Sequence, residues 1–294
     1  MNILVIGGTG TVGSEVVRRL LDKGAEVRVM TRSWDKAAAL PEGVHTVIGD
    51  LMDESTLEAA YDGIASLFIL VPVGPNETQM GRAAVQAAKA YNVKRIVYLS
   101  VADAESASHI PHFGSKIPIE NAVRDSGLEN TILRPNNFYQ NDSWFKDAIL
   151  QMGVYPQPIG MIGLNRVDVR DIADAAVHSL TKPGHNGDIY TLGGPEALTG
   201  EDVAKIYSRH LGREIRYGGN DLNAWEIEAS KMLPDYMVHD FKIMYDHFQK
   251  KGLLSTPADM ALQRKALGHE PRTFDAFVAE TVASWVDTTA KVSG

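Results

Sequence analysis

Hydrophobic residues in the first half of the chain follow two alternating patterns. Short continuous apolar runs are typical of parallel strands that are buried on both faces. Between them, apolar residues recur every three or four positions, as they do in helices. Residues 3–6 form the first run, and Val12, Val16 and Leu20 then mark one face of a helix over residues 11–23. Strands that alternate with helices predict an α/β fold, a doubly wound parallel sheet of the Rossmann type with helices on both faces.

The alternation continues to about residue 135 and then becomes irregular. Further strands are predicted at residues 27–30, 44–48, 67–71, 95–99, 130–133 and 189–192. From Leu222 onward the chain is expected to be mostly helical. We therefore predict a Rossmann domain over residues 1–150, joined by a helix and strand from 165–195, and a smaller, mostly helical substrate-binding region over residues 151–294.

A glycine-rich loop joins the first predicted strand to the first predicted helix. It reads Gly-Gly-Thr-Gly-Thr-Val-Gly over residues 7–13. Glycines permit a tight turn and a close backbone approach to a pyrophosphate, and a helix N-terminus offers N–H groups to the phosphates. A plain tight turn is the alternative, but the strand-to-helix context favours a dinucleotide site. The residues assigned to this site are Gly7, Thr9, Gly10, Thr11, Val12 and Gly13.

The end of the second predicted strand bears on the choice of cofactor. An acidic residue about twenty positions past the glycines would bind the ribose 2′-hydroxyl of NAD. This chain has Arg32 there, and Lys36 follows within reach. A guanidinium suits a 2′-phosphate through charge-assisted hydrogen bonds. The pattern favours NADP(H), with NAD(H) and a merely solvated surface arginine as the alternatives.

Two further loops follow strands at the edge where such sheets bind ligands. Asp50 and Leu51 follow the third strand and are expected beside the adenine, although Asp50 also suits a local turn. Val71 and Pro72 end the fourth strand. We expect both to line the cofactor site, and Pro72 also to contact the substrate.

Composition narrows the classes of function. The 294 residues include no cysteine, which excludes disulfides, thiolate metal sites and cysteine nucleophiles. The net charge of −8, without a dense basic stretch, argues against a nucleic-acid partner. No apolar run approaches the roughly 20 residues of a membrane span, and Met1 leads almost directly into a strand, so a cytoplasmic protein is expected. Neither metal-ligand spacing nor a Gly-x-Ser-x-Gly hydrolase elbow is present.

Candidate catalytic residues follow the fifth predicted strand. Together with the glycine loop they resemble the short-chain dehydrogenase/reductase superfamily, whose usual set is a serine at the end of this strand and Tyr-x-x-x-Lys on the next helix. Ser100 occupies the serine position. No tyrosine is followed by a lysine four residues later, and the nearest match runs from His112 to Lys116. The resemblance implies that Lys116 anchors the nicotinamide ribose, with His112 in place of the phenol.

Three other segments are similar to the atypical NmrA-like branch of that superfamily. They are Lys-Ile-Pro-Ile-Glu at residues 116–120, Leu-Arg-Pro-Asn at 133–136 and Asp-Val-Arg-Asp-Ile-Ala at 168–173. The similarity extends to about residue 215 and fades beyond it. The branch includes NAD(P)H-dependent quinone oxidoreductases and dye reductases, and also non-catalytic redox sensors that act through protein partners.

The resemblance implies an NADPH-dependent oxidoreductase that transfers hydride to a planar small-molecule acceptor, such as a quinone or a conjugated dye. Asn136, Asn137 and Phe138 follow the sixth strand and, with Pro72, are the expected substrate contacts. A non-catalytic sensor is the first alternative. A sugar-nucleotide epimerase-like enzyme is the second, and the missing Tyr-x-x-x-Lys disfavours it. Apolar residues of the C-terminal helical region are candidates for pairing two copies in a homo-oligomer.

Overall fold

The chain divides into two compact units. The computed structural model describes the backbone of residues 1–292 and the side chains of residues 1–286, so the last two residues of the predicted region 151–294 lie outside the described part. Unit 1 comprises Met1–Pro135, Val169–Leu192 and Pro257–Glu270. Unit 2 comprises Asn136–Asp168, Gly193–Thr256 and Pro271–Gly294. Each unit is described here by itself.

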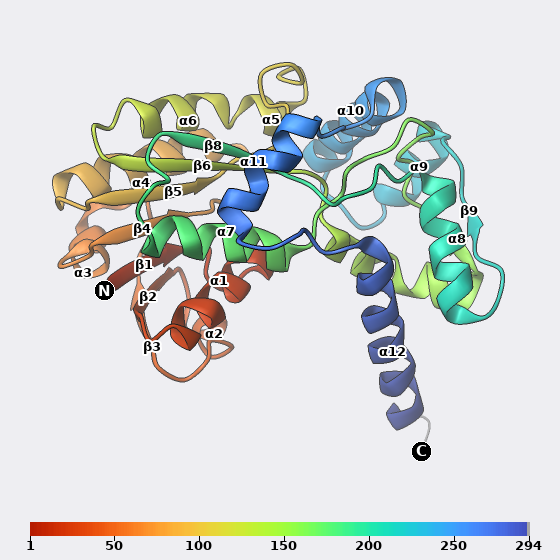
Figure 1. The fold of residues 1–294 in the computed structure, drawn as a ribbon, viewed down its shortest axis with the longest axis horizontal. Coiled ribbons are helices and arrows are strands. Elements are labelled where there is room, and N and C mark those ends of the chain that lie inside the picture. The colour runs from red at the N-terminus through yellow and green to blue at the C-terminus, as the bar shows by residue number, and fades with distance from the viewer. Residues whose placement is uncertain (293–294) are drawn as a thin grey trace. The chain divides into compact units, whose positions relative to one another are not determined.

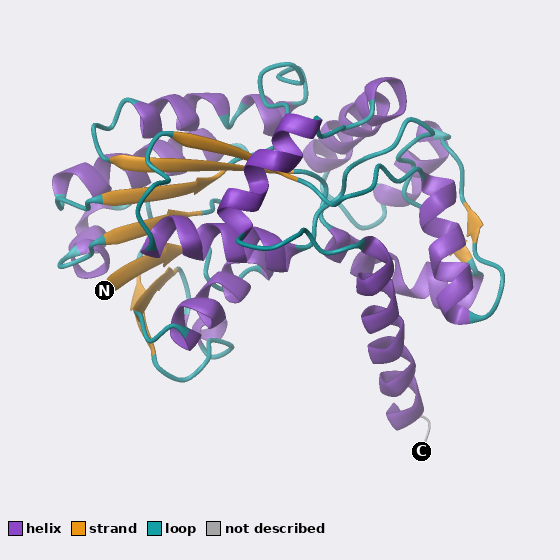
Figure 2. Cartoon of the chain, viewed as in Figure 1, coloured by secondary structure: helices purple, strands orange, loops and turns teal. Residues whose placement is uncertain are grey.

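Unit 1 is built on one seven-stranded sheet whose strands are all parallel (Figure 2). Their order is β3-β2-β1-β4-β5-β6-β8, the doubly wound order that the sequence pattern predicts. The strands are β1 (Asn2–Ile6), β2 (Glu26–Thr31), β3 (Val44–Ile48), β4 (Ser66–Ile69), β5 (Arg95–Leu99), β6 (Glu129–Pro135) and β8 (Asp188–Leu192). The Rossmann prediction is confirmed.

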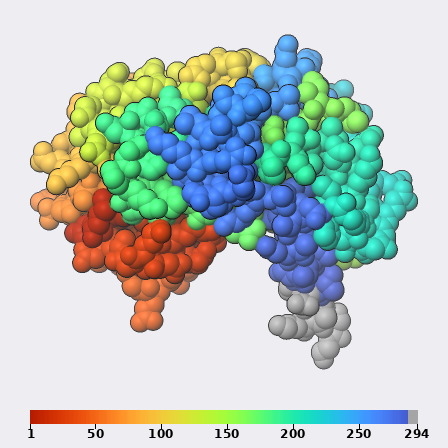
Figure 3. Space-filling model, in the orientation of Figure 1, coloured from red at the N-terminus to blue at the C-terminus, as the bar shows by residue number. Residues whose placement is uncertain are grey.

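Helices cover both faces of this sheet (Figure 1). In unit 1 they are α1 (Thr11–Asp22), α2 (Trp34–Ala37), α3 (Leu57–Tyr61), α4 (Glu77–Ala90), α5 (Pro111–Gly114), α6 (Ile117–Arg124), α7 (Val169–Thr181) and α11 (Pro257–Leu267). Helix α1 packs on α7, and α4 packs on both α3 and α6. Helix α11 packs against α7 and β8, and Figure 3 shows α7 and α11 side by side on one face of this unit.

Strand β1 shows how the sequence pattern creates the two layers. Successive side chains of a strand point to opposite faces, so a strand between two helical layers must be apolar throughout. Leu4 and Ile6 belong to the core cluster that includes α3, α4 and α6. Ile3 and Val5 point to the opposite face, and all four side chains are at most 5% exposed. Burial of such side chains stabilises the fold by roughly 1.5–3 kcal/mol each.

Unit 2 is mostly helical. Its elements are the 3-10 helix η2 (Tyr139–Phe145), the π-helix η3 (Ala148–Met152), β7 (Val154–Tyr155), α8 (Gly200–Leu211), β9 (Arg216–Tyr217), α9 (Leu222–Ala229), α10 (Asp235–Lys251) and α12 (Phe274–Val292). Thr199 caps the N-terminus of α8 with a capping box. Its hydroxyl accepts the backbone N–H of Asp202, and the Asp202 carboxylate accepts the backbone N–H of Thr199. The predicted helical character of the C-terminal part is confirmed.

The division between the units differs from the predicted boundaries in two places. The first long segment of unit 1 ends at residue 135 rather than 150, because β6 ends there and η2 packs within unit 2. Helix α11, expected in the second region, belongs to unit 1 because it packs on β8 and α7. Within the described residues, no helix is long and apolar enough to cross a membrane.

Candidate functional site

The parallel register brings the ends of three strands to one edge of unit 1. Ile6 at the end of β1 pairs with Met30 of β2 on one side and with Ile69 of β4 on the other. The segments 7–13, 31–36 and 70–76 therefore leave the sheet at adjacent positions. From β1 the chain moves outward to β2 and β3, and it then crosses to the other side of β1 to form β4. The position beside β1 is therefore the switch point where open α/β sheets bind ligands.

The glycine loop needs its glycines for its own geometry. Gly7 has a φ of +81°, and a Cβ there would lie 2.5 Å from the carbonyl oxygen of Leu70. A Cβ on Gly13 would lie 2.1 Å from the carbonyl oxygen of Gly7, far inside van der Waals contact. The N–H of Gly10 donates to the Gly7 carbonyl at 3.0 Å and closes the turn. Larger residues at positions 7 and 13 would therefore force the loop open.

The N-terminus of α1 is left open by the same loop. Gly10 caps the helix without a side chain, and the first turn contains no acidic residue. Thr9, Gly10 and Thr11 are exposed, whereas Val12 and Gly13 are buried. The first N–H groups of a helix have no intrahelical partner, and the helix dipole places partial positive charge there. These residues fit a dinucleotide pyrophosphate, since the open helix N-terminus offers N–H donors and no acidic side chain opposes an anion there.

Arg32 and Lys36 lie where the 2′-phosphate assignment requires cations. Both side chains are exposed, and both follow the end of β2. Among the residues with described side chains, neither has a hydrogen-bond or ion-pair partner. Two cations without partners at the edge of the sheet suit a phosphate ligand.

Asp50 and Leu51 occupy the turn after β3. The Asp50 carboxylate accepts the N–H of Met52 at 2.9 Å, and the Asp50 N–H donates to the Thr56 hydroxyl at 2.9 Å. Asp50 thus forms a local turn, which is the predicted alternative to an adenine contact. Leu51 is buried, as is Val71 after β4, while Pro72 is exposed.

Ser100 belongs to a buried ionic network. Its hydroxyl donates to Glu120 Oε1 at 2.5 Å, and it is 4% exposed. Arg134 donates to the same carboxylate from Nε at 2.9 Å. Burial opposes the charge of Arg134, but the hydrogen bonds that it donates to Glu120 and Glu105 raise its pKa overall. The network ties β5, α6 and β6 together at this edge.

Lys116 is buried beside a carboxylate that the sequence pattern does not indicate. Its Nζ forms an ion pair with Glu77 of α4, and the two side chains are 7% and 1% exposed. The other Glu77 oxygen accepts the Ser115 hydroxyl at 2.7 Å. The Thr78 hydroxyl donates to the Ser115 carbonyl at 2.7 Å. Lys116 therefore reaches the edge of the sheet in a fixed position.

His112 and Tyr98 are the two candidate proton donors near this cluster. His112 is half-buried, its ring packs edge-on against Phe113, and its carbonyl accepts the Ser115 hydroxyl at 3.1 Å. The Tyr98 hydroxyl is buried and lacks a partner among the described residues. Burial, together with the Glu77 and Glu120 carboxylates, raises the pKa of Tyr98 well above its ordinary value. Tyr98 therefore stays protonated within the core, and of the two only His112 is partly accessible.

The predicted substrate residues after β6 lie in unit 2. Asn136 is buried and donates to the Leu253 carbonyl at 2.7 Å. Asn137 Oδ1 accepts Arg166 Nε at 3.0 Å, and the carbonyl of Phe138 accepts the same guanidinium at 2.9 Å. Both amides thus stabilise unit 2. The ring of Phe138 is half-buried, so part of it is accessible to a ligand.

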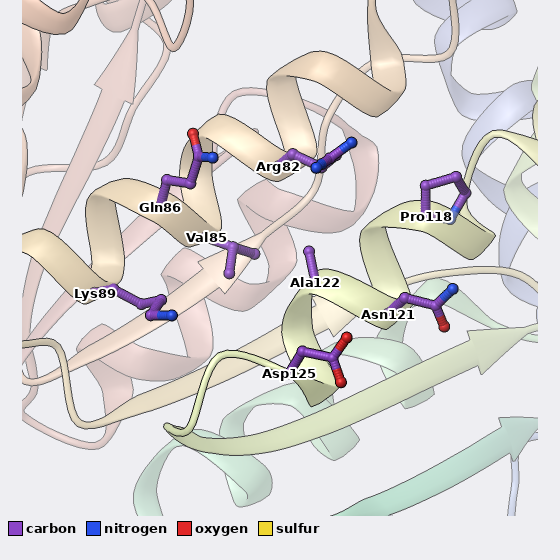
Figure 4. A pocket seen from close by; sticks show the side chains of 8 residues that line it. All are labelled: Arg82, Val85, Gln86, Lys89, Pro118, Asn121, Ala122 and Asp125. Atoms are coloured by element: carbon purple, nitrogen blue, oxygen red, sulfur yellow. The ribbon is translucent and has the colours of Figure 1, made fainter.

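A surface groove of about 430 Å³ runs between α4 and α6 (Figure 4). Side chains from both helices line it: Arg82, Val85, Gln86, Lys89, Pro118, Asn121, Ala122 and Asp125. None of the predicted site residues is among them. The groove is therefore separate from the predicted cofactor site.

Comparison with known proteins places the chain among reductases. A profile of the NmrA-like family matches residues 1–278. An NAD(P)H azoreductase of Xenophilus azovorans is 38% identical over 216 residues, which cover 73% of this chain and 76% of that protein. A (4-alkanoyl-5-oxo-2,5-dihydrofuran-3-yl)methyl phosphate reductase of Streptomyces griseus is 38% identical over 217 residues, covering 73% and 76%. The NADPH complex of an NADPH-dependent quinone oxidoreductase from Escherichia coli is 26% identical with a TM-score of 0.85, covering 95% of this chain and 99% of that one.

Proposed function

Because the chain belongs to the NmrA-like family, we propose that it is an NADPH-dependent oxidoreductase that reduces a planar conjugated acceptor such as a quinone or an azo dye. The observation that carries the proposal is the edge of unit 1, where an uncapped helix N-terminus lies beside two cations without partners. Its relatives named as an azoreductase and a quinone oxidoreductase support the acceptor class.

The protein's part in this reaction is binding and orientation. NADPH supplies the hydride, so the residues need to hold the cofactor, shape the acceptor site and manage charge. The glycine loop and the first turn of α1 bind the pyrophosphate, and Arg32 with Lys36 binds the 2′-phosphate. We assign the acceptor contact to the side chain of Pro72, which is exposed after β4.

Lys116 is the residue that we assign to the nicotinamide end. Its ammonium has three N–H donors, and Glu77 takes one of them. The remaining donors bind the nicotinamide ribose and donate a hydrogen bond toward negative charge that develops on the acceptor. A reduced quinone or dye then takes its proton from water or from His112. This route does not require the phenol of the usual short-chain enzymes.

Titration calorimetry with NADPH and NADH, followed by turnover assays with a quinone and an azo dye, tests the proposal. We expect NADPH to bind more tightly than NADH, and its absorbance to decay on addition of acceptor. Binding without turnover of any quinone or dye contradicts the enzymatic part and favours the sensor alternative. Failure to bind either dinucleotide contradicts the proposal as a whole.

A further inference from the structure

Glu77 links two segments that both begin at the carboxyl edge of the sheet. Glu77 is the first residue of α4, which follows the loop after β4. Its oxygens accept hydrogen bonds from Lys116 Nζ and from the Ser115 hydroxyl, which belong to the segment after β5. The Thr78 hydroxyl donates to the backbone of the same partner segment. Because Glu77 is in the first turn of a 14-residue helix, the helix dipole also stabilises its negative charge.

A glycine one turn farther along α4 makes this contact possible. A Cβ on Gly81 would lie 2.5 Å from Ile119 Cδ1 of α6. Glycine inside a helix costs about 1 kcal/mol relative to alanine. Here it lets α4 and α6 approach closely, and Gly81 and Ile119 lie one turn beyond Glu77 and Lys116 respectively. The helix spacing thus holds the carboxylate within reach of the ammonium.

The pair also has an electrostatic consequence for a bound nicotinamide. The ring carries one positive charge when it is oxidised and none when it is reduced. An isolated lysine ammonium beside it would repel the oxidised form, whereas a buried ion pair has no net charge. A buried charge whose partner has been removed acts strongly on its neighbours, because little solvent screens it.

We propose that Glu77 positions Lys116 and cancels its charge, and thereby sets the relative affinity of the chain for NADP+ and NADPH. This inference rests on the proposed function, in which Lys116 lies at the nicotinamide. A purely structural role for Glu77 would change the affinities for the two redox forms equally. The ratio of the two dissociation constants therefore separates the two roles.

The test is calorimetric titration of the full chain with NADP+ and NADPH at one pH and ionic strength. Glu77→Gln keeps the shape and the acceptor atom but leaves the ammonium unbalanced. We expect it to raise the ratio Kd(NADP+)/Kd(NADPH) on the order of tenfold. Lys116→Gln should lower the ratio by a similar factor. The double variant, which has two neutral amides, should return it to within about threefold of the wild type.

Glu129→Gln is the matched control, because Glu129 pairs with Arg95 at 2.6 Å where β5 and β6 begin, at the opposite edge of the sheet. It should leave the ratio unchanged. Equal weakening of both redox forms by Glu77→Gln overturns the inference while the proposed function stands. If Glu77→Gln does not fold, the test rests on Lys116→Gln, and an unchanged ratio of dissociation constants in that variant overturns the inference. A wild-type chain that binds neither form overturns the proposed function and this inference together.

Discussion

The two ends of the proposed cofactor site are built in opposite ways. The phosphate end consists of a backbone loop, an uncapped helix and exposed cations without partners in the described part of the chain. The nicotinamide end consists of buried side chains that are already paired, with Glu77 holding Lys116 and Glu120 holding Ser100. The phosphate end can therefore gain its charge partners from the ligand, whereas the nicotinamide end fixes its charges before a ligand arrives.

The contrast predicts different responses to mutation. Substitutions at the phosphate end should change affinity more than stability, except where a glycine is needed by the loop itself. Substitutions at the nicotinamide end should change stability, affinity and turnover together, since a removed partner leaves a buried charge.

Gly13→Ala should have the largest effect. Its Cβ would lie 2.1 Å from the Gly7 carbonyl, so the loop must open. We expect NADPH affinity to fall more than about 100-fold and the free energy of unfolding to fall by about 3 kcal/mol. Calorimetry and thermal unfolding measure the two effects. Gly10→Ala is the control, because its Cβ meets nothing closer than 3.5 Å; it should unfold like the wild type.

Lys116→Met comes next, because it leaves the Glu77 carboxylate buried without its cation. We expect a loss of about 3 kcal/mol in the free energy of unfolding, and turnover lowered about 10- to 100-fold. Chemical denaturation and steady-state assays report these changes. Lys265→Met, which removes an exposed ion pair with Asp188, is the control and should change neither by much. Wild-type turnover in the Lys116 variant would remove this residue from the proposed mechanism.

Arg32→Ala should weaken NADPH binding about tenfold or more, because charge-assisted hydrogen bonds to a phosphate are lost. NADH, which lacks the 2′-phosphate, should bind as before, and the thermal midpoint should not move. Arg18→Ala is the matched control on the exposed face of α1, where Arg18 pairs with Glu15 and Asp22. Equal loss of both cofactors in the Arg32 variant would contradict the 2′-phosphate assignment.

Tyr98→Phe should have the smallest effect. The hydroxyl has no partner among the described residues, so its removal abolishes no hydrogen bond, and burial keeps it protonated. We expect stability within about 0.5 kcal/mol of the wild type, or slightly above it, and unchanged turnover. Tyr61→Phe, which removes a hydrogen bond to the Ala84 carbonyl, is the comparison. A turnover loss in Tyr98→Phe alone would identify a tyrosine proton donor.

Local sequence is enough to predict the sheet and the tight turn of the glycine loop, because these depend on periodicity and on neighbours along the chain. The apolar runs predict the strands, and the glycines of residues 7–13 are required by the tight turn that they form. The nicotinamide end could not be assembled in this way. Lys116 and Glu77 are 39 positions apart and meet only because α4 and α6 pack at Gly81. The one available signal for Glu77 was its place in the first turn after the β4 loop.

Ser100 shows the opposite difficulty. Its position at the end of β5 was read correctly from the pattern, but position alone does not reveal what the hydroxyl contacts. Glu120 lies 20 positions later and accepts the hydrogen bond that the Ser100 hydroxyl donates. The same holds for Asn136 and Asn137, whose amides satisfy partners from distant segments of unit 2.

Helix α11 gives unit 1 a particular order of assembly. It follows residue 256 in the chain yet packs on α7 and β8, with Lys265 paired to Asp188 at 2.7 Å and the Ala266 carbonyl bound to the His178 ring at 2.9 Å. During vectorial synthesis the glycine loop leaves the ribosome well before α11, so unit 1 lacks this covering helix until residues 257–267 have emerged. A complete unit 1 therefore contains a helix that is synthesised only after residues 193–256 of unit 2.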